Sequence, residues 1–330
     1  MRLGSTSGSL RWLERTLWVG AILFPLLGWT QDYPKRAITL IVPFAPGGGT
    51  DSVARDLAKS LSEKLGQSVV VDNRGGGGGA IGALALAKAA PDGYTLMLAT
   101  STFLTHAAVE SALPYDVSKD FASVAMLGRG PLLVVVSKDL GVKNIGQLLD
   151  VAARRPQGLD YCSAGTGSIN HMAGELFRQK TKANLTHVPY KGSGPATLDL
   201  IAGRVQLFIA TVPSILPLVK DGRVEALAIT STQRSKLFPD LPTVNESGVP
   251  GFQISTWWGV VAPAKTPVTL INQINAAVND AASNPQFRNR LLNEGADVVR
   301  ASPAEFDQFL GEELAMWRNV VKGAQLKLKE

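Results

Sequence analysis

Glycine and small hydroxyl residues, not clusters of charged side chains, are the groups in this chain whose positions suggest chemistry. They follow apolar segments that predict β-strands, where the next turn or helix leaves backbone N–H groups unpaired. The hydroxyl residues are Thr50, Thr100, Ser101, Thr102, Ser163, Thr166, Ser168, Ser193 and Thr211. Hydrogen bonds from such groups hold an anion without burying an opposing charge, and each contributes about 1.5–3 kcal/mol. The pattern favours binding of a small anion without a chemical step.

The first of these turns lies in residues 38–51. An apolar, β-branched run at residues 38–42 predicts a buried strand, Pro43 and Pro46 stop it, and three glycines then allow close approach of a ligand. We expect Thr50 or Asp51 to cap the helix that follows, whose first N–H groups attract a carboxylate or phosphate. An ordinary strand-to-helix turn is the alternative that this segment alone leaves open.

Two nucleotide-binding motifs are weak or absent. Gly77, Gly79 and Gly82 fit G-x-G-x-x-G, but the first two belong to a run of five glycines that fits many patterns, and no acidic residue stands where a ribose would need it. The G-x-x-x-x-G-K-[ST] arrangement does not occur. A flexible turn is the better interpretation of residues 75–79.

A nucleophilic site is also poorly supported. Ser168 and His171 share a predicted helix face near Ser163, but no G-x-S-x-G elbow surrounds the serine and no carboxylate obviously orients the histidine. Capping of the helix explains Ser168 better, and Cys162 ends an apolar strand where a buried, inert thiol is usual. We therefore expect no enzyme activity, with a hydrolase that uses the same cleft as the less favoured alternative.

Composition and the N-terminal residues indicate where the protein is found and which kinds of partner and metal site are not expected. Arg2, Arg11 and Arg15 precede or flank a short apolar stretch, which predicts a signal peptide over residues 1–30 and export to the periplasm; an uncleaved membrane anchor is the alternative. Without the leader the net charge falls from +6 to +4, with no basic runs, so nucleic acid is not an expected partner. One cysteine and three histidines make a disulfide framework or zinc site improbable. No metal and no cofactor is predicted.

Strand-like and helical segments alternate along nearly the whole chain. The order strand, helix, strand, helix, strand over residues 38–99 is repeated over residues 132–209, with a strand predicted at residues 132–136. This predicts an α/β fold with parallel-rich sheets and two chain crossings. We expect residues 31–132 and 255–330 to form one lobe, residues 133–254 the other, and the glycine-rich loops to face a ligand cleft between them.

Specific motifs extend over nearly all of the mature chain. They are residues 33–51, 69–76, 91–96, 113–116 and 188–195, continued by residues 241–244, 248–252 and 255–259. These motifs closely resemble the substrate-binding proteins of tripartite tricarboxylate transporters, the Bug-type family. The resemblance implies a two-lobed, type II periplasmic-binding-protein-like fold that closes on a small organic carboxylate and delivers it to the permease subunits of a membrane transporter. We also expect the chain to be a monomer.

The resemblance implies ligand-binding residues in three loops. They are Phe44, Ala45, Pro46, Gly47, Gly48, Thr50 and Asp51 in the first, Ser163, Ala164, Gly165, Thr166, Gly167 and Ser168 in the second, and Lys191, Gly192 and Ser193 in the third. Thr100, Ser101, Thr102, Ala210, Thr211 and Trp257 complete the predicted set. Asp51 would repel a bound carboxylate at close range, so we expect it to cap the helix or to orient the loop.

Two departures from the family pattern bear on the ligand. Many relatives carry Phe-Asp-Asn where this chain has Ile209, Ala210 and Thr211, and the missing aspartate removes a partner for an ammonium group. An amino acid is therefore a less favoured ligand than a plain organic acid. Phe103 and His106 are candidates to line the far end of the pocket, although a core phenylalanine and a surface histidine are the commoner outcomes. A periplasmic sensor or scaffold that contacts a signalling receptor is the alternative to transport.

Overall fold

The computed structural model describes residues 1, 4, 33–47, 49–110, 112–293 and 295–324. The chain divides into two units, Met1–Tyr33 and Pro34–Glu330, and the fold is that of the second. The predicted signal peptide, residues 1–30, lies almost wholly outside the described residues. None of the helices within the described ranges is long and apolar enough to cross a membrane.

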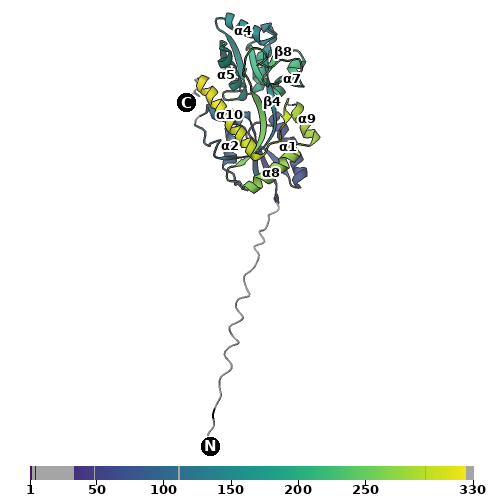
Figure 1. The fold of residues 1–330 in the computed structure, drawn as a ribbon. Coiled ribbons are helices and arrows are strands. Elements are labelled where there is room, and N and C mark those ends of the chain that lie inside the picture. The colour runs from purple at the N-terminus through teal and green to yellow at the C-terminus, as the bar shows by residue number, and fades with distance from the viewer. Residues whose placement is uncertain (2–3, 5–32, 48, 111, 294, 325–330) are drawn as a thin grey trace. The chain divides into compact units, whose positions relative to one another are not determined.

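The first part of the chain forms parallel strands joined by helices (Figure 1). β1 (Ile38–Val42) pairs in parallel with β2 (Val69–Asn73) on one edge and with β3 (Thr95–Thr100) on the other. The crossovers are α1 (Gly49–Leu65) and α2 (Ala80–Ala87), and the turn η1 (Gly77–Gly79) precedes α2. α1 buries Val53, Leu57 and Leu61, as their helical spacing predicts.

A second parallel group repeats this arrangement. β5 (Leu159–Ser163) lies between β6 (Leu185–Pro189) and β7 (Leu207–Thr211) and is parallel to both. The helices of this part are α4 (Ile145–Arg154), α5 (Ile169–Thr181), α6 (Ser193–Ile201) and α7 (Val212–Lys220), and the turn η2 (Lys138–Leu140) precedes α4. The carboxyl ends of β1, β3, β5 and β6 therefore each lead into a helix at a predicted binding loop.

One long strand joins the two groups. β4 (Phe121–Ser137) pairs antiparallel with β9 (Ser255–Pro263) over its first part and with β7 and β8 (Val224–Ile229) over its second. The described strands form the path β2-β1-β3-β9-β4-β7-β5-β6, and the short β10 (Asp297–Val298) also pairs with β4. The chain passes from one group to the other in β4 and returns just before β9. The predicted α/β fold with parallel groups and two crossings is confirmed.

The strand predicted at residues 132–136 is too short. β4 begins eleven residues earlier, at Phe121, and contains Gly128, Gly130 and Pro131, which ordinarily end a strand. A Cβ on Gly130 would lie 2.5 Å from the Gly295 carbonyl oxygen, and one on Gly128 would lie 3.1 Å from that of Asp297. Residues 295–297 approach the backbone of β4 so closely that a side chain at either position would clash, and glycine is therefore needed at both.

The C-terminal helices complete the fold. They are α8 (Val268–Ala281), α9 (Pro285–Asn293) and α10 (Pro303–Ala324), and α3 (Ser101–Val109) follows β3. α10 packs against both α3 and α5, and the Gln179 side-chain amide in α5 donates a hydrogen bond of 2.7 Å to the Val320 carbonyl oxygen in α10. The last helix therefore contacts elements from both strand groups.

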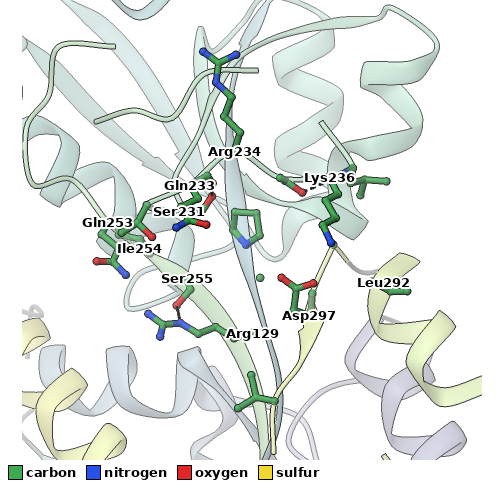
Figure 2. A pocket seen from close by; sticks show the side chains of 18 residues that line it. Arg129, Ser231, Gln233, Arg234, Lys236, Gln253, Ile254, Ser255, Leu292 and Asp297 are labelled. Carbon is green, nitrogen blue, oxygen red and sulfur yellow. Dashed lines mark hydrogen bonds between the residues drawn. The ribbon is translucent and has the colours of Figure 1, made fainter. Parts of the chain in front are cut away.

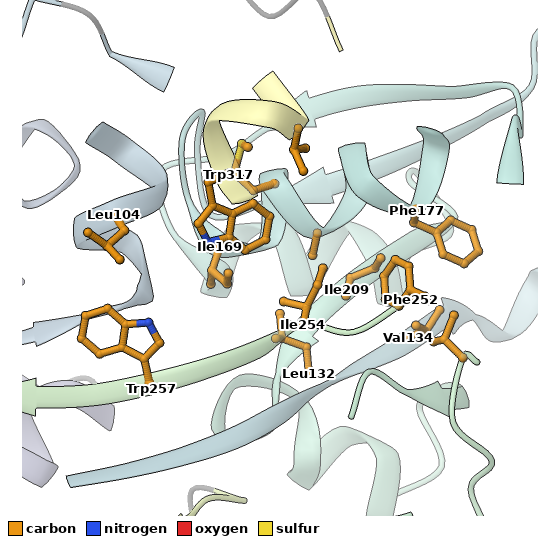
Figure 3. Packing of buried hydrophobic residues seen from close by; sticks show 14 of the residues in the cluster. Leu104, Leu132, Val134, Ile169, Phe177, Ile209, Phe252, Ile254, Trp257 and Trp317 are labelled. Atoms are coloured by element: carbon orange, nitrogen blue, oxygen red, sulfur yellow. The ribbon is translucent and has the colours of Figure 1, made fainter. Parts of the chain in front are cut away.

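The main hydrophobic core continues across both groups (Figure 3). Leu104 and Trp257 come from the first group, Phe177 and Phe252 from the second, and Trp317 of α10 lies beside them. Phe103 is also buried in this core and packs edge-on against Phe121 at 5.0 Å between ring centroids. The commoner outcome for Phe103, a core residue, is the one observed.

Candidate functional site

The first binding loop connects β1 to α1. Ala45, Pro46 and Gly47 are exposed, Phe44 is half-buried, and Gly47 has a φ of 88°, which favours glycine. Gly48 lies outside the described residues. α1 begins at Gly49, so Thr50 and Asp51 lie in its first turn, and the prediction that one of them occupies the cap position is wrong.

Asp51 orients this loop. Its buried carboxylate accepts hydrogen bonds from the Gly47 backbone N–H (3.0 Å), from Arg55 Nε (2.9 Å) and from Asn73 Nδ2 (2.9 Å). Asn73 Nδ2 also lies 3.2 Å from the Phe44 carbonyl oxygen, so the second strand is tied to the same loop. Burial alone would raise the pKa of Asp51, but the bonds from Arg55, Gly47 and Asn73 hold that pKa below its ordinary value. Asp51 is therefore ionised at neutral pH.

The residues after β3 are held by β9. Ser101 is fully buried; its Oγ accepts a hydrogen bond from the Trp257 backbone N–H (2.9 Å) and lies 3.3 Å from Thr256 Oγ1. Thr100 ends β3 and is buried, and Thr102 is half-buried. One turn later, Thr105 Oγ1 donates to the Gly167 carbonyl oxygen at 2.8 Å. The first strand group and the second binding loop are in direct contact here.

The second loop connects β5 to α5. Gly165 and Gly167 have φ values of 130° and 79°; Ala164 precedes the first glycine, and Thr166 lies between the two. Ser168 is the N-cap of α5, because its Oγ accepts from the His171 backbone N–H at 3.3 Å. The predicted capping role of Ser168 is confirmed.

All three histidines of the chain gather around this loop. His187 Nε2 lies 2.6 Å from Ser163 Oγ, the His187 and His171 rings stack at 4.0 Å, and the Gly167 N–H donates to His171 Nδ1 at 3.2 Å. A Cβ on Gly167 would lie 3.1 Å from His106, which also contacts Gly78. Burial, together with the neighbouring His171, lowers the pKa of His187 to about 3. Burial lowers the pKa of His106 and of His171 as well, so these rings are neutral at neutral pH.

Ser163 and His187 resemble the nucleophile and the base of a catalytic site, but among the described residues no carboxylate is hydrogen-bonded to His187. Glu175, an acidic residue of α5, accepts instead from Tyr161 Oη (2.6 Å) and from Arg178 (2.7 Å). Cys162 is buried, and burial raises the pKa of its thiol to about 12. Ser163 Oγ also accepts from the Gly165 N–H at 3.1 Å, so His187 and Ser163 together set the shape of the loop.

The third loop is attached to the second. The Gly192 N–H donates to the Ala164 carbonyl oxygen and the Tyr190 N–H to the Ser163 carbonyl oxygen, both at 3.1 Å. Lys191 is exposed, and Ser193 is the first residue of α6. These backbone bonds place both loops on the same edge of the sheet.

The remaining predicted residues differ in exposure. Ala210 is buried in β7, and Thr211, the half-buried N-cap of α7, is hydrogen-bonded to Ser214 Oγ at 3.1 Å. The Trp257 side chain is fully buried; its ring packs against Phe306 and its Nε1 donates to Glu313. Contact of the predicted residues with a ligand stays a prediction.

Asn73 and His187 were not among the predicted site residues. Asn73 could have been found from the sequence, because it is a polar residue at the carboxyl end of an apolar strand, β2, as the predicted loop residues are in theirs. His187 carried none, since it lies inside a strand and meets Ser163 only through the pairing of β5 with β6.

A cavity of about 510 Å³ lies elsewhere, beside the crossing of β4 (Figure 2). It is lined by residues 129–131, 231–237, 253–255, 292, 295–297 and 299. It contains none of the predicted ligand-binding residues. Arg129, Arg234, Lys236 and Asp297 supply its charged groups.

Comparison with known proteins gives consistent relatives. Residues 53–326 match the model of the tripartite tricarboxylate transporter family receptor, TctC. Protein BugT of Bordetella pertussis is 40% identical over 301 residues, which cover 91% of this chain and 92% of BugT. The structure of R. palustris Rpa4515 with adipate is similar, with a TM-score of 0.83 and 38% identity over 90% of this chain and 99% of that chain.

MatC from Rhodopseudomonas palustris with bound malate is a further similar structure. It has a TM-score of 0.79 and 35% identity over 88% of this chain and all of that chain. The periplasmic binding protein BugD is also similar, with a TM-score of 0.80 and 32% identity over 90% of this chain and all of that chain.

Proposed function

Because the chain belongs to the tripartite tricarboxylate transporter receptor family, a family of solute-binding proteins, we propose that it captures a small organic carboxylate in the periplasm and delivers it to membrane permease subunits. We place the ligand between the first loop (residues 44–51) and the second and third loops (residues 163–168 and 191–193). The chain would work as a monomer that reaches the periplasm by its signal peptide. The adipate and malate bound by two similar proteins support a carboxylate.

The observation that carries this proposal is the contact of α3 with the second loop and of the second loop with the third. The hydrogen bond from Thr105 to Gly167 and the packing of His106 against Gly167 join the first strand group to the second loop. Backbone bonds join the second loop to the third. Small residues, backbone N–H groups and neutral histidines form these walls, which suits binding by hydrogen bonds without turnover.

The proposed mechanism is closure of two lobes. Residues 31–132 with 255–330 would form one lobe and residues 133–254 the other, with β4 and the segment before β9 as the crossings. Closure would bring the first loop and the second loop onto opposite sides of the carboxylate. Such closure excludes water, which strengthens the hydrogen bonds to the charged ligand.

A thermal-shift screen of mono- and dicarboxylates, including adipate and malate, tests the proposal. A ligand at 100 times its dissociation constant stabilises the folded protein by about 2.7 kcal/mol, so a true ligand raises Tm measurably. Calorimetry then gives the affinity and stoichiometry of each hit, with one site expected. A broad panel without any shift would argue strongly against a carboxylate receptor.

A glycine substitution tests the location of the site. Gly47 has a φ of 88° and open space around its Cβ position, so Gly47→Val strains the first loop without a clash in the core. Gly248→Val is the matched control, because Gly248 has a φ of 94° and equally open space far along the chain from the loops. We expect Gly47→Val to abolish carboxylate binding and Gly248→Val to retain it. Equal affinities would place the ligand elsewhere.

A further inference from the structure

The cavity beside the β4 crossing has the size and the composition of a ligand site. Its volume of about 510 Å³ lies within the usual range for small-molecule sites, about 300–1,000 Å³. Its walls come from β4, from the loop after β8, from the residues leading into β9 and from the segment around β10. In Figure 2, Lys236 and Asp297 lie on one side of the opening and Gln253, Ser255 and Arg129 on the other.

The cationic side chains of this cavity outnumber its acidic ones by three to one. Arg129 is held in place, because its Nε donates to Ser255 Oγ at 2.6 Å and its guanidinium lies 5.3 Å from the centroid of the Phe309 ring. Arg234 is paired with Glu246 at 3.1 Å. Lys236 has no hydrogen bond or ion pair with any part of the chain that the structure describes. The cavity therefore has positive charge that its own residues do not neutralise.

This cavity is separate from the predicted carboxylate loops. Ser101 of the loop after β3 contacts Thr256 Oγ1, whereas Arg129 of the cavity contacts Ser255 Oγ. Consecutive side chains of a strand point to opposite faces, so the Ser255 and Thr256 side chains leave β9 on opposite sides, and none of the residues that line the cavity belongs to the predicted ligand-binding set. Occupancy of one does not require residues of the other.

We propose that the cavity is a second binding site, selective for a small oxyanion with two or more negative charges, such as inorganic phosphate or a polycarboxylate. Arg129 supplies a preoriented planar donor, Lys236 a mobile ammonium, and the side chains of Gln233 and Gln253 further hydrogen-bond donors. Asp297 opposes the anion and limits its affinity. Because the walls come from strands that pair with both parts of β4, the bound anion also links residues on both sides of the crossing.

Calorimetry with inorganic phosphate, and separately with citrate, tests this site on the purified protein. We expect one phosphate or citrate per chain, bound more weakly as salt is added. Lys236→Gln should weaken binding by ~10-fold, the loss of one charge-assisted hydrogen bond. Asp297→Asn should strengthen binding by ~3-fold or more, because it removes the opposing charge. Binding of phosphate alone or of citrate alone would identify which oxyanion the cavity accepts.

Matched variants separate this site from general surface charge and from the carboxylate loops. Lys59→Gln removes an exposed lysine of α1, far along the chain from the cavity, and should leave phosphate and citrate binding unchanged. Gly47→Val should also leave that binding unchanged, even where carboxylate binding at the loops is lost. Absence of binding to the unmodified protein, or equal affinities of Lys236→Gln and Lys59→Gln, would overturn the proposal. Equal affinities of Asp297→Asn and the unmodified protein would overturn it too.

Discussion

Asp51 shows how a single residue can prepare an anion site while carrying the wrong charge for direct contact. Its carboxylate accepts from Gly47, Arg55 and Asn73, so its lone pairs are directed into the protein. The first loop is thereby held open with Ala45, Pro46 and Gly47 exposed. Repulsion of a bound carboxylate predicted that Asp51 either caps the helix or orients the loop, and the second alternative is the one observed.

Asp51→Ala should lower the free energy of unfolding by ~1–3 kcal/mol, because it leaves the Asn73 amide and the Gly47 N–H without their buried acceptor. Urea denaturation at neutral pH measures the change. Asp150→Ala is the control, since Asp150 is an exposed helical residue, and its effect should stay within ~0.5 kcal/mol. A loss no larger than that of the control would mean that Asp51 does not stabilise the loop.

The pH dependence of the Asp51 effect has a definite sign. Since the pKa of Asp51 is lowered in the folded protein, its stabilising contribution is present above the unfolded value of about 3.9. The contribution is lost as pH falls through the folded pKa. The difference between Asp51→Ala and the unmodified protein should therefore shrink in acid.

At the scale of elements, the parallel groups were predictable and the joining strand was not. β1 and β3 are short, mostly apolar runs next to proline or glycine, which is the pattern of a strand covered on both faces. β4 violates that pattern, because Gly128, Gly130 and Pro131 lie in its middle. These residues are explained only by the approach of residues 295–297, a contact of the tertiary structure that no local pattern contains.

The same limit applied to the candidate site. Loops at the carboxyl ends of strands could be located along the chain, because each follows an apolar run directly. The contacts between loops could not, since Thr105 meets Gly167 across 62 residues and Ser163 meets His187 through strand pairing. The buried position of the Trp257 ring likewise depends on α10.

α10 brings a buried carboxyl group to β9. Glu313 lies against Trp257, which donates its indole N–H to the carboxylate. Burial raises the pKa of Glu313 to about 7, and the Trp257 bond and the Arg129 charge only partly offset that effect. In the folded protein Glu313 therefore stays protonated up to about pH 7, whereas the unfolded chain releases this proton near pH 4.3.

Glu313→Gln should remove a pH dependence of stability. Because the pKa is raised on folding, Glu313 makes the protein less stable as pH rises from about 4.3 to about 7, with no further change above that. At pH 8 the Gln variant, whose side-chain oxygen still accepts from Trp257, should be more stable by up to ~4 kcal/mol. Urea denaturation from pH 4.5 to 8 compares the two proteins. Parallel stability curves would show that Glu313 does not titrate in this range.

At the scale of the whole molecule, the two strand groups meet in two ways. α10 packs on α3 and α5 through a continuous apolar core, whereas Thr105 and His106 meet the second loop through a hydrogen bond and glycine contacts. A large apolar contact is costly to open, while a single hydrogen bond contributes only about 0.5–1.5 kcal/mol. In the proposed lobe closure, the contact of Thr105 and His106 with the second loop is therefore the one suited to form when the ligand binds and to break when it leaves.

Thr105→Val distinguishes a contact made on closure from a permanent one. If the bond to Gly167 forms only around bound carboxylate, its loss should weaken binding by ~5-fold and leave the unfolding free energy of the unliganded protein within ~0.5 kcal/mol. Thr266→Val is the matched control, because buried Thr266 donates to the Pro263 carbonyl oxygen three residues away at 2.7 Å. That variant should lose stability and keep its affinity. If Thr105→Val behaves in the same way, the two groups are joined at α3 without ligand, and closure must take place elsewhere.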